Sequence, residues 1–242
     1  MKASATDVKN SFGKYLKKCT EEDIYITKND KIVAKLVNYS DAGEGTLFVT
    51  ESNAAYNYSG KRMSYEEFIN LTEDIEERYE FIEGEIYLLA SPGVNHQVIH
   101  SNLYKKLLLW FDGKKCQVFS APFDVTLYNV ETNSKNVVQP DLLVTCDHRE
   151  TTNEKDRYMG IPSLVIEIVS KHARSRDLVT KLNVYLEGGI NEYWIIDPQK
   201  KQVLQYYFAD KQDCQLVVYR YQDILKSFHF EGLEIDVAEI FA

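Results

Sequence analysis

Two carboxylates are associated with segments that we predict to be buried strands. One lies at the start of such a segment and the other lies inside one. Asp141 follows Pro140 and opens the apolar run 142–144, and Glu167 lies inside the otherwise apolar run 164–169. Burying an ionised carboxylate costs on the order of several kcal/mol unless it is paired or bound to a cation. Two such acids on neighbouring strands favour a hard divalent cation with oxygen ligands. For Glu167, a salt bridge to a nearby Lys or Arg is an alternative that the acids alone do not exclude.

A basic, polar stretch follows the Glu167 segment directly and predicts a phosphate-binding loop. Its three basic residues are Lys171, Arg174 and Arg176. The stretch opens a helix that we expect over 176–187, in which Asp177 and Lys181 stand at i and i+4. An exposed ion pair of about 0.3–0.5 kcal/mol is a sufficient explanation for Asp177. Lys181, in contrast, can point back toward the strand ends that carry the two acids.

Two histidines share one face of the helix expected over 96–111. His96 and His100 stand at i and i+4, a spacing that can bind zinc. A zinc site needs further His or Cys ligands, and no third one is evident in the sequence. We therefore interpret His96 as a residue of the cleft and His100 as structural.

The charge of the chain is unevenly distributed. The 242 residues carry a net charge of −9, which argues against a protein that coats nucleic acid nonspecifically. Residues 1–40 hold eight lysines against five acids, so this part is +3 and the remainder is −12. An acidic body can still bind a polyanion if its acids chelate a metal and its bases line one cleft.

The cysteines predict reduced thiols. Cys19, Cys116, Cys146 and Cys214 are widely separated and form no CxxC pair. We expect neither a disulfide frame nor a zinc site, as in a cytoplasmic protein. The longest apolar run, 107–111, is too short to cross a bilayer, and the N-terminus lacks the apolar region of a signal peptide.

The chain divides into three predicted parts. Residues 1–40 form a helix, with Thr6 as its N-cap, followed by a β-hairpin over 24–37 that turns at 28–31. Residues 41–60 are rich in Ser, Gly and Asn and predict a linker.

The pattern of apolar residues over 61–242 predicts one α/β (α+β) domain. Ser64 and Glu67 form a capping box at the start of a helix, and helices are also expected over 96–111 and 176–187. Strands are expected over 79–82, 85–89, 117–128, 141–146, 163–169, 193–196, 202–208 and 214–221, with a tail at 228–241 that packs last. This order predicts a mixed central sheet with helices on its faces.

Motifs spread over residues 61–242 resemble one known family. They include the segments 78–85, Ser91-Pro92, 139–142, 165–170, 176–178, 189–190, 192–194, Asp197-Pro198 and 232–241, together with His96, Lys181 and Tyr185. In this order they resemble the Uma-type putative restriction endonuclease family, a branch of the PD-(D/E)XK nuclease superfamily. The resemblance implies a restriction-endonuclease-like fold and metal-dependent hydrolysis of phosphodiesters.

The resemblance also implies roles for particular residues. Asp141 matches the Asp of the PD motif and Glu167 the acid of (D/E)XK, both metal ligands. Val169 stands where the motif's Lys is usual, so Lys181 on the next helix becomes the candidate for that amine. Glu80 matches the acid of the first core element and could complete the ligands or hold a second ion. Mg²⁺ is the expected cofactor, with Mn²⁺ as an alternative.

One departure from the family and one further resemblance remain. Where the family pattern has Ser-Pro-Ser, this chain has Ser170-Lys171-His172, which adds positive charge suited to phosphate.

Residues 1–40 resemble the N-terminal half of prevent-host-death type antitoxins through Thr6-Asp7-Val8, the segment 12–16 and the hairpin. That resemblance implies dimerisation and operator binding, although a small appendage that only dimerises fits equally well.

These observations predict a cytoplasmic Mg²⁺-dependent DNA endonuclease. We expect its N-terminal module to be antitoxin-like and the protein to form a homodimer. Its expected partner is DNA, and the sequence does not decide whether it also binds a toxin. The alternative is a catalytically inactive regulator that keeps the nuclease fold as a binding scaffold. The joint presence of Glu80, Asp141, Glu167 and Lys181 favours the enzyme, whereas the acidic body favours the regulator.

Overall fold

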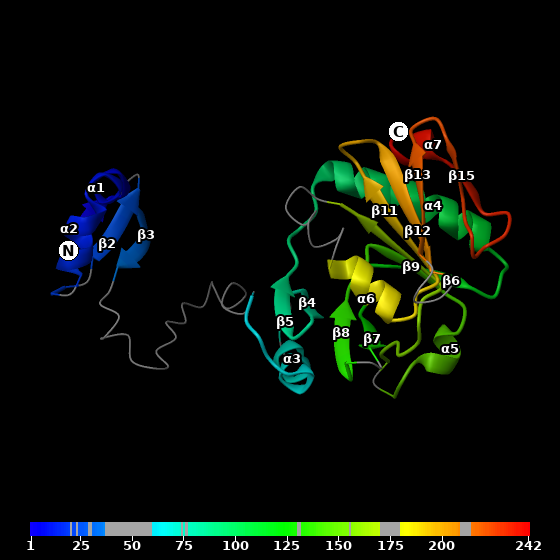
Figure 1. Ribbon diagram of the computed structural model, residues 1–242, viewed down its shortest axis with the longest axis horizontal. Helices are drawn as coiled ribbons and strands as arrows, with labels where there is room; N and C mark the ends of the chain where they lie inside the picture. Colours follow the sequence, from blue (N-terminus) through cyan, green and yellow to red (C-terminus); the bar gives the residue numbers. More distant parts are fainter. Residues whose placement is uncertain are drawn as a thin grey trace. The chain divides into compact units, whose positions relative to one another are not determined.

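The chain folds into two compact units, Met1–Ala54 and Ala55–Ala242 (Figure 1). The computed structural model describes residues 1–19, 21–22, 24–28, 31–36, 60–73, 75, 77–129, 132–154, 156–169, 180–208 and 214–242. The division falls inside the predicted linker, of which residues 41–59 lie outside the described ranges. The predicted boundaries of that linker therefore stay a prediction.

The N-terminal unit is a three-stranded sheet with two short helices. Its elements are β1 (Lys2–Ser4), α1 (Ala5–Asn10), α2 (Phe12–Lys18), β2 (Ile24–Lys28) and β3 (Lys31–Leu36). In the order β1-β2-β3, the first two strands are parallel and the last two antiparallel. Its buried core is Ala3, Val8, Tyr15, Cys19 and Ile24.

The N-terminal unit differs from the prediction in three details. The N-cap is Ser4 rather than Thr6, because the Ser4 hydroxyl accepts a hydrogen bond from the Asp7 amide at 3.1 Å. The single expected helix is divided at Ser11 into α1 and α2. Strand β1 was not expected, since three residues are too few to show an alternating pattern. Its pairing with β2 becomes visible only in the fold.

The larger unit contains two main sheets and several helices. Its elements are α3 (Tyr65–Thr72), β4 (Tyr79–Ile82), β5 (Glu85–Leu88), α4 (Val94–Phe111), β6 (Gln117–Ser120), β7 (Val125–Asn129), β8 (Ser134–Val138), β9 (Leu142–Thr145), α5 (His148–Thr151), β10 (Leu164–Ile168), α6 (Lys181–Glu187), β11 (Glu192–Asp197), β12 (Gln202–Phe208), β13 (Cys214–Arg220), β14 (Ile224–Lys226), β15 (Glu234–Asp236) and α7 (Val237–Ile240). A six-stranded sheet has the order β13-β12-β11-β10-β9-β6, and a four-stranded sheet has the order β5-β4-β8-β7. The expected capping box between Ser64 and Glu67 is present at the start of α3.

The central strands β9, β10 and β11 of the six-stranded sheet are buried on both faces. Within this sheet, β10 and β11 run parallel, while the other neighbours are antiparallel. Trp194 and Ile196 of β11 pack toward α4 and the C-terminal segment. Tyr193 and Ile195 of the same strand pack toward α6 on the opposite face (Figure 1). Because successive side chains of a strand point to opposite faces, a strand covered on both sides reads as a continuous apolar run.

One predicted strand is two strands in different sheets. The segment expected as a strand over 117–128 is broken around the cis peptide bond between Ala121 and Pro122. Strand β6 before the break pairs with β9, and β7 after it pairs with β8. Strand β8 was not expected. A Pro cannot donate a ladder hydrogen bond, so the chain leaves one sheet and enters the other at this point.

Glu192 shows how a buried carboxylate can serve packing alone. The residue is fully buried and accepts hydrogen bonds from Trp194 Nε1 at 2.5 Å and Gln205 Nε2 at 2.6 Å. The Ser227 hydroxyl and the His229 amide donate to its other oxygen at 2.7 and 2.9 Å. These donors satisfy the charge and attach the segment after β14 to the sheet.

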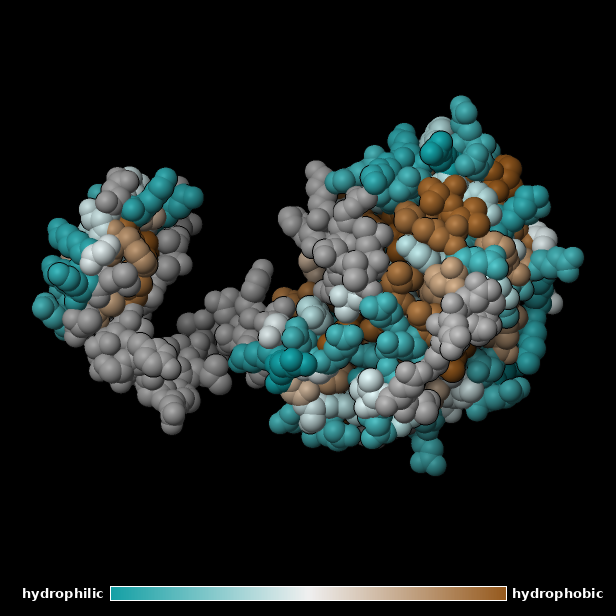
Figure 2. All heavy atoms as spheres, in the orientation of Figure 1, coloured by the Kyte–Doolittle hydropathy of each residue, from teal (hydrophilic) through white to brown (hydrophobic). Residues whose placement is uncertain are grey.

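The edge strand β13 carries apolar side chains to the surface. Leu216 is 49% exposed and Val218 is 44% exposed. Figure 2 shows hydrophobic surface over the region of β12 and β13. Among the described residues, no helix combines the length and the apolar character needed to span a membrane.

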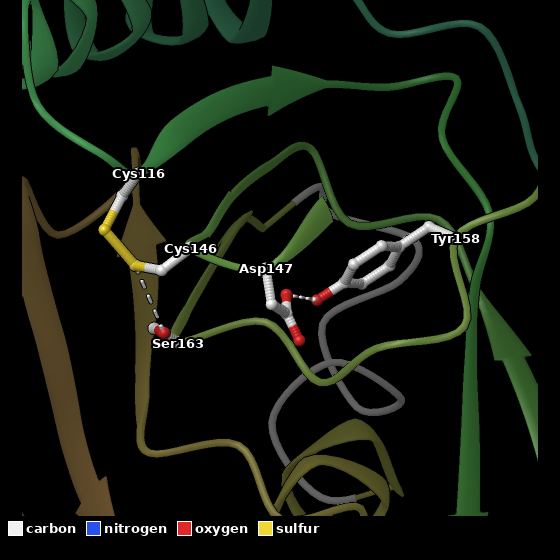
Figure 3. Close-up of a disulfide and its surroundings, with 5 residues drawn as sticks. All are labelled: Cys116, Cys146, Asp147, Tyr158 and Ser163. Carbon is white, nitrogen blue, oxygen red and sulfur yellow. Dashed lines mark hydrogen bonds between the residues drawn. A yellow bond between two sulfur atoms is a disulfide. The ribbon is translucent and has the colours of Figure 1, made fainter. Parts of the chain in front are cut away.

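The prediction of four reduced thiols is wrong for two of the cysteines. Cys116 and Cys146 form a disulfide, with their Cα atoms 4.0 Å apart, and Ser163 Oγ donates to Cys146 Sγ at 3.8 Å (Figure 3). Gln117 of β6 lies opposite Thr145 of β9, so the register places the two cysteines opposite each other at the end of this pair. A separation of 30 residues in the sequence hides this neighbourhood. Cys19 and Cys214 are not part of a disulfide, in line with the predicted thiols.

We expect the disulfide to stabilise the larger unit. Replacing both cysteines in Cys116→Ser/Cys146→Ser should lower the free energy of unfolding by about 3–4 kcal/mol, since the bond closes a loop of 30 residues. Urea denaturation under non-reducing conditions measures this loss. The control Cys214→Ser replaces an exposed cysteine outside the disulfide and should leave the midpoint unchanged. A double variant as stable as the wild type would contradict the expectation.

Candidate active site

The four residues predicted for the site come from four segments of the larger unit. Glu80 lies in β4, Asp141 directly precedes β9, Glu167 lies in β10, and Lys181 is the first residue of α6. In the antiparallel pair β9–β10, Leu142 and Ile166 are the last paired residues, and extending this register by one residue sets Asp141 opposite Glu167. The Ile168 amide, which follows Glu167, donates to Asp141 Oδ2 at 2.8 Å. Directly opposed residues of an antiparallel pair have neighbouring side chains. The two motif acids are therefore neighbours across this strand pair.

A buried ammonium group connects Glu80 and Glu167. Lys181 Nζ lies 2.7 Å from Glu80 Oε1 and 2.6 Å from Glu167 Oε1. The exposed fractions of the three residues are 2% for Lys181, 0% for Glu80 and 5% for Glu167. Each charge would be costly at this depth by itself, so the three stabilise one another. The salt bridge considered for Glu167 is thus present, and its partner is the predicted Lys181.

Glu80 is also tied to the segment that carries Asp141. Its Oε1 accepts a hydrogen bond from the Gln139 amide at 3.0 Å. The Gln139 side chain accepts from Arg78 Nε at 2.8 Å and donates to Asp124 at 2.7 Å. The four-stranded sheet and the start of β9 are thereby joined beside the site.

Tyr185 is a further residue of this cluster that we did not predict as a site residue. Its hydroxyl donates to Glu167 Oε1 at 2.7 Å, and the side chain is fully buried. Burial, followed by the charge of Glu167, raises the pKa of Tyr185 well above its ordinary value, so the hydroxyl stays protonated. The signal in the sequence is its spacing of i+4 from Lys181, which places both on one helix face.

Asp141 is the most exposed of the three acids, with 21% of its side chain exposed. Its Oδ2 accepts a hydrogen bond from the Ile168 amide at 2.8 Å and lies 3.2 Å from His96 Nε2. Burial alone would raise the pKa of Asp141. The hydrogen bond and charge of His96, the Ile168 amide and the charge of Lys181 outweigh burial and lower it below its usual value. Asp141 is therefore an anion at neutral pH, at the open end of the cluster.

The two helix histidines contact the same residue through different atoms. His96 reaches the carboxylate of Asp141, as described above. His100 Nε2 lies 3.2 Å from the Asp141 carbonyl oxygen and 2.9 Å from Ser120 Oγ. Burial lowers the pKa of His100, although the charge of Asp141 opposes this effect. His96 thus contacts the acidic cluster through the Asp141 carboxylate. His100 connects α4 to the backbone carbonyl of the same residue.

The donor set fits a hard cation held by a pair of carboxylates. In the described ranges, no group of three or more His, Cys, Asp or Glu side chains is arranged to hold a metal ion. All three acids already have protein partners, and Asp141 and Glu167 are the two that oppose each other across β9–β10, which makes this pair the candidate ligands. Mg²⁺ is commonly bound by one or two carboxylates, several waters and substrate phosphates. Ligation by all three acids stays a prediction.

The predicted phosphate-binding loop cannot be placed. Lys171, Arg174 and Arg176 lie in the segment 170–179, outside the described residues. The helix expected over 176–187 is described from its second part onward, as α6.

The chain is related to known proteins in both sequence and fold. The family described as Uma2, putative restriction endonuclease, matches residues 65–238, and the chain belongs to this family. The crystal structure of a putative nuclease belonging to DUF820 from Anabaena variabilis ATCC 29413 shares the fold. Its TM-score is 0.60 at 21% identity, covering 74% of this chain and 97% of that one. The expected fold, a central mixed sheet flanked by helices, is confirmed.

Two relatives come from Synechocystis sp. (strain ATCC 27184 / PCC 6803 / Kazusa). The uncharacterized protein slr1290 is 25% identical over 166 residues, covering 68% of this chain and 84% of that protein. The uncharacterized protein sll1609 is 28% identical over 138 residues, covering 57% of this chain and 76% of that protein.

We expect the buried ammonium to be essential for stability. Lys181→Met should lower the free energy of unfolding by about 3–5 kcal/mol, because two carboxylates are then left buried without their cation. Adding Glu80→Gln to this variant should restore part of the loss, since one of the two charges is removed. Denaturant unfolding measures both effects, and the exposed Lys200→Met is the control. Wild-type stability of Lys181→Met would show that the ion pairs contribute nothing.

Proposed function

We propose that the chain is a divalent-metal-dependent endonuclease that hydrolyses phosphodiester bonds of DNA, with Mg²⁺ as the cofactor and Mn²⁺ as an alternative. The observation that carries the proposal is the opposition of Asp141 and Glu167 across β9–β10 beside the buried Lys181. Membership of the family supports the reaction class. A purely structural set of ion pairs has no need for a partly exposed Asp141 at its end.

Each side chain has a distinct task in this proposal. Asp141 and Glu167 hold the cation, which when bound polarises the phosphodiester and activates a water molecule. Lys181 pairs with the buried Glu167 carboxylate and offsets negative charge that develops on the phosphate. Glu80 anchors Lys181 through its carboxylate. His96, beside Asp141 at the exposed end, contacts the incoming phosphate, with Lys171, Arg174 and Arg176 as further phosphate-binding residues.

The N-terminal unit is proposed as an antitoxin-like module for dimerisation and DNA binding. Lys14, Lys17 and Lys18 line one surface hollow at α2, together with Gly13 and Glu21. Clustered lysines attract the phosphate backbone, whereas the acidic larger unit repels it. Two copies would supply two active sites, as a double-strand cut requires. The rival proposal is a catalytically inactive regulator on the same fold, and the net charge of −12 outside residues 1–40 favours it.

Nicking of supercoiled plasmid DNA tests the enzyme against the regulator. With Mg²⁺ or Mn²⁺, the wild type should nick, and Asp141→Ala and Glu167→Ala should each reduce the rate on the order of 100-fold or more. Loss of outer-shell partners alone costs about 10–100-fold at metal sites. The control is Glu231→Ala, an exposed acid outside the cluster, which should nick like the wild type. Equal cleavage by all four proteins would show that the site is misassigned, and no cleavage by any would favour the regulator.

A further inference from the structure

The Glu167 carboxylate receives donors from two successive turns of one helix face. Lys181 Nζ lies 2.6 Å from Glu167 Oε1, and the Tyr185 hydroxyl donates to the same oxygen at 2.7 Å. Both donors come from α6, and both are almost completely buried. Glu167 is therefore held through one identified oxygen atom.

The two donors differ in how strongly they define a direction. The Lys181 ammonium ends a flexible stem, carries three rotatable donors and is shared with Glu80. The Tyr185 hydroxyl ends a rigid ring that is packed against the Tyr193 ring, with centroids 4.7 Å apart. The terminal torsion of a glutamate side chain is intrinsically broad, so external contacts must set the plane of its carboxylate. Of the two, the tyrosine is the donor whose position is set by packing.

We propose that Tyr185 is a positioning residue of the candidate active site, whose hydroxyl orients the Glu167 carboxylate toward the divalent cation. This inference rests on the proposed function. Lys181 supplies the compensating charge, while Tyr185 supplies the orientation. Lys181 and Tyr185 stand four residues apart on α6, and this spacing lets both donors reach the same oxygen of Glu167.

A hydrogen bond to a metal ligand has a measurable consequence for metal affinity. Outer-shell partners orient the ligands they contact, and their removal costs about 10–100-fold in metal affinity or activity. The substitution Tyr185→Phe removes only the hydroxyl and keeps the ring in the core. It should therefore weaken Mn²⁺ binding without disturbing the charge balance of Lys181, Glu80 and Glu167.

The chain offers a matched control for this substitution. The Tyr158 hydroxyl also donates to a carboxylate, that of Asp147 at 3.0 Å (Figure 3). Asp147 follows the end of β9 that is opposite to Asp141. Tyr158→Phe thus removes the same kind of hydrogen bond from the same domain, away from the candidate site.

The test measures Mn²⁺ affinity of the full chain by isothermal titration calorimetry in the absence of DNA, with thermal unfolding in parallel. Tyr185→Phe should bind Mn²⁺ about 10–100-fold more weakly than the wild type. Tyr158→Phe should bind like the wild type, and Glu167→Gln should lose the site. Plasmid nicking by Tyr185→Phe should recover toward the wild-type rate as Mn²⁺ is raised by a similar factor, which a loss of folding would not allow.

The outcomes separate this inference from the proposed function. If Glu167→Gln loses Mn²⁺ binding and Tyr185→Phe retains wild-type affinity, Tyr185 is structural and the inference fails while the metal site stands. Equal loss of affinity in Tyr185→Phe and Tyr158→Phe also overturns it, because the effect is then general. If the wild type and Glu167→Gln bind Mn²⁺ equally, or neither binds, the proposed metal site fails and the inference fails with it.

Discussion

The larger unit is organised around a buried ammonium group that two buried carboxylates share. Lys181, Glu80 and Glu167 come from a helix and from strands of two different sheets, and none of their charges is stable alone in a dry interior. The three elements must therefore meet with their charges in contact. This requirement joins the four-stranded sheet to the six-stranded sheet at one point. The candidate chemistry lies at the same point.

Two buried carboxylates of this domain show different uses of one functional group. Glu192 accepts hydrogen bonds from uncharged donors on both of its oxygens and holds the C-terminal segment against the sheet. Glu167 is paired with an ammonium group and a hydroxyl, and it stands opposite the partly exposed Asp141. Burial alone therefore does not identify a site. A second acid that is close, ionised and reachable from solvent makes the difference.

Much of the candidate site was accessible from the residues themselves. An acid inside an apolar run, as at Glu167, signals a partner or a ligand, and the helix that follows supplies Lys181 at its start. Tyr185 was not predicted as a site residue because a tyrosine on the apolar face of a helix usually indicates a residue of the hydrophobic core. The disulfide was missed because Cys116 and Cys146 become neighbours only through the pairing of β6 with β9. Strand β8 and the division of the 117–128 segment were missed for a similar reason.

By itself, the sequence determined the properties that depend on near neighbours along the chain. These are the periodicity of helices and strands, the capping of α3, the family membership implied by ordered motifs, and the identity of the acids and the lysine. The tertiary structure decided which strands pair, in which register, and which donor meets which oxygen. Those properties depend on contacts between residues that are tens of positions apart, such as Glu80 with Lys181. Local sequence patterns do not specify such contacts. Many alternative strand pairings would bury the same apolar side chains equally well.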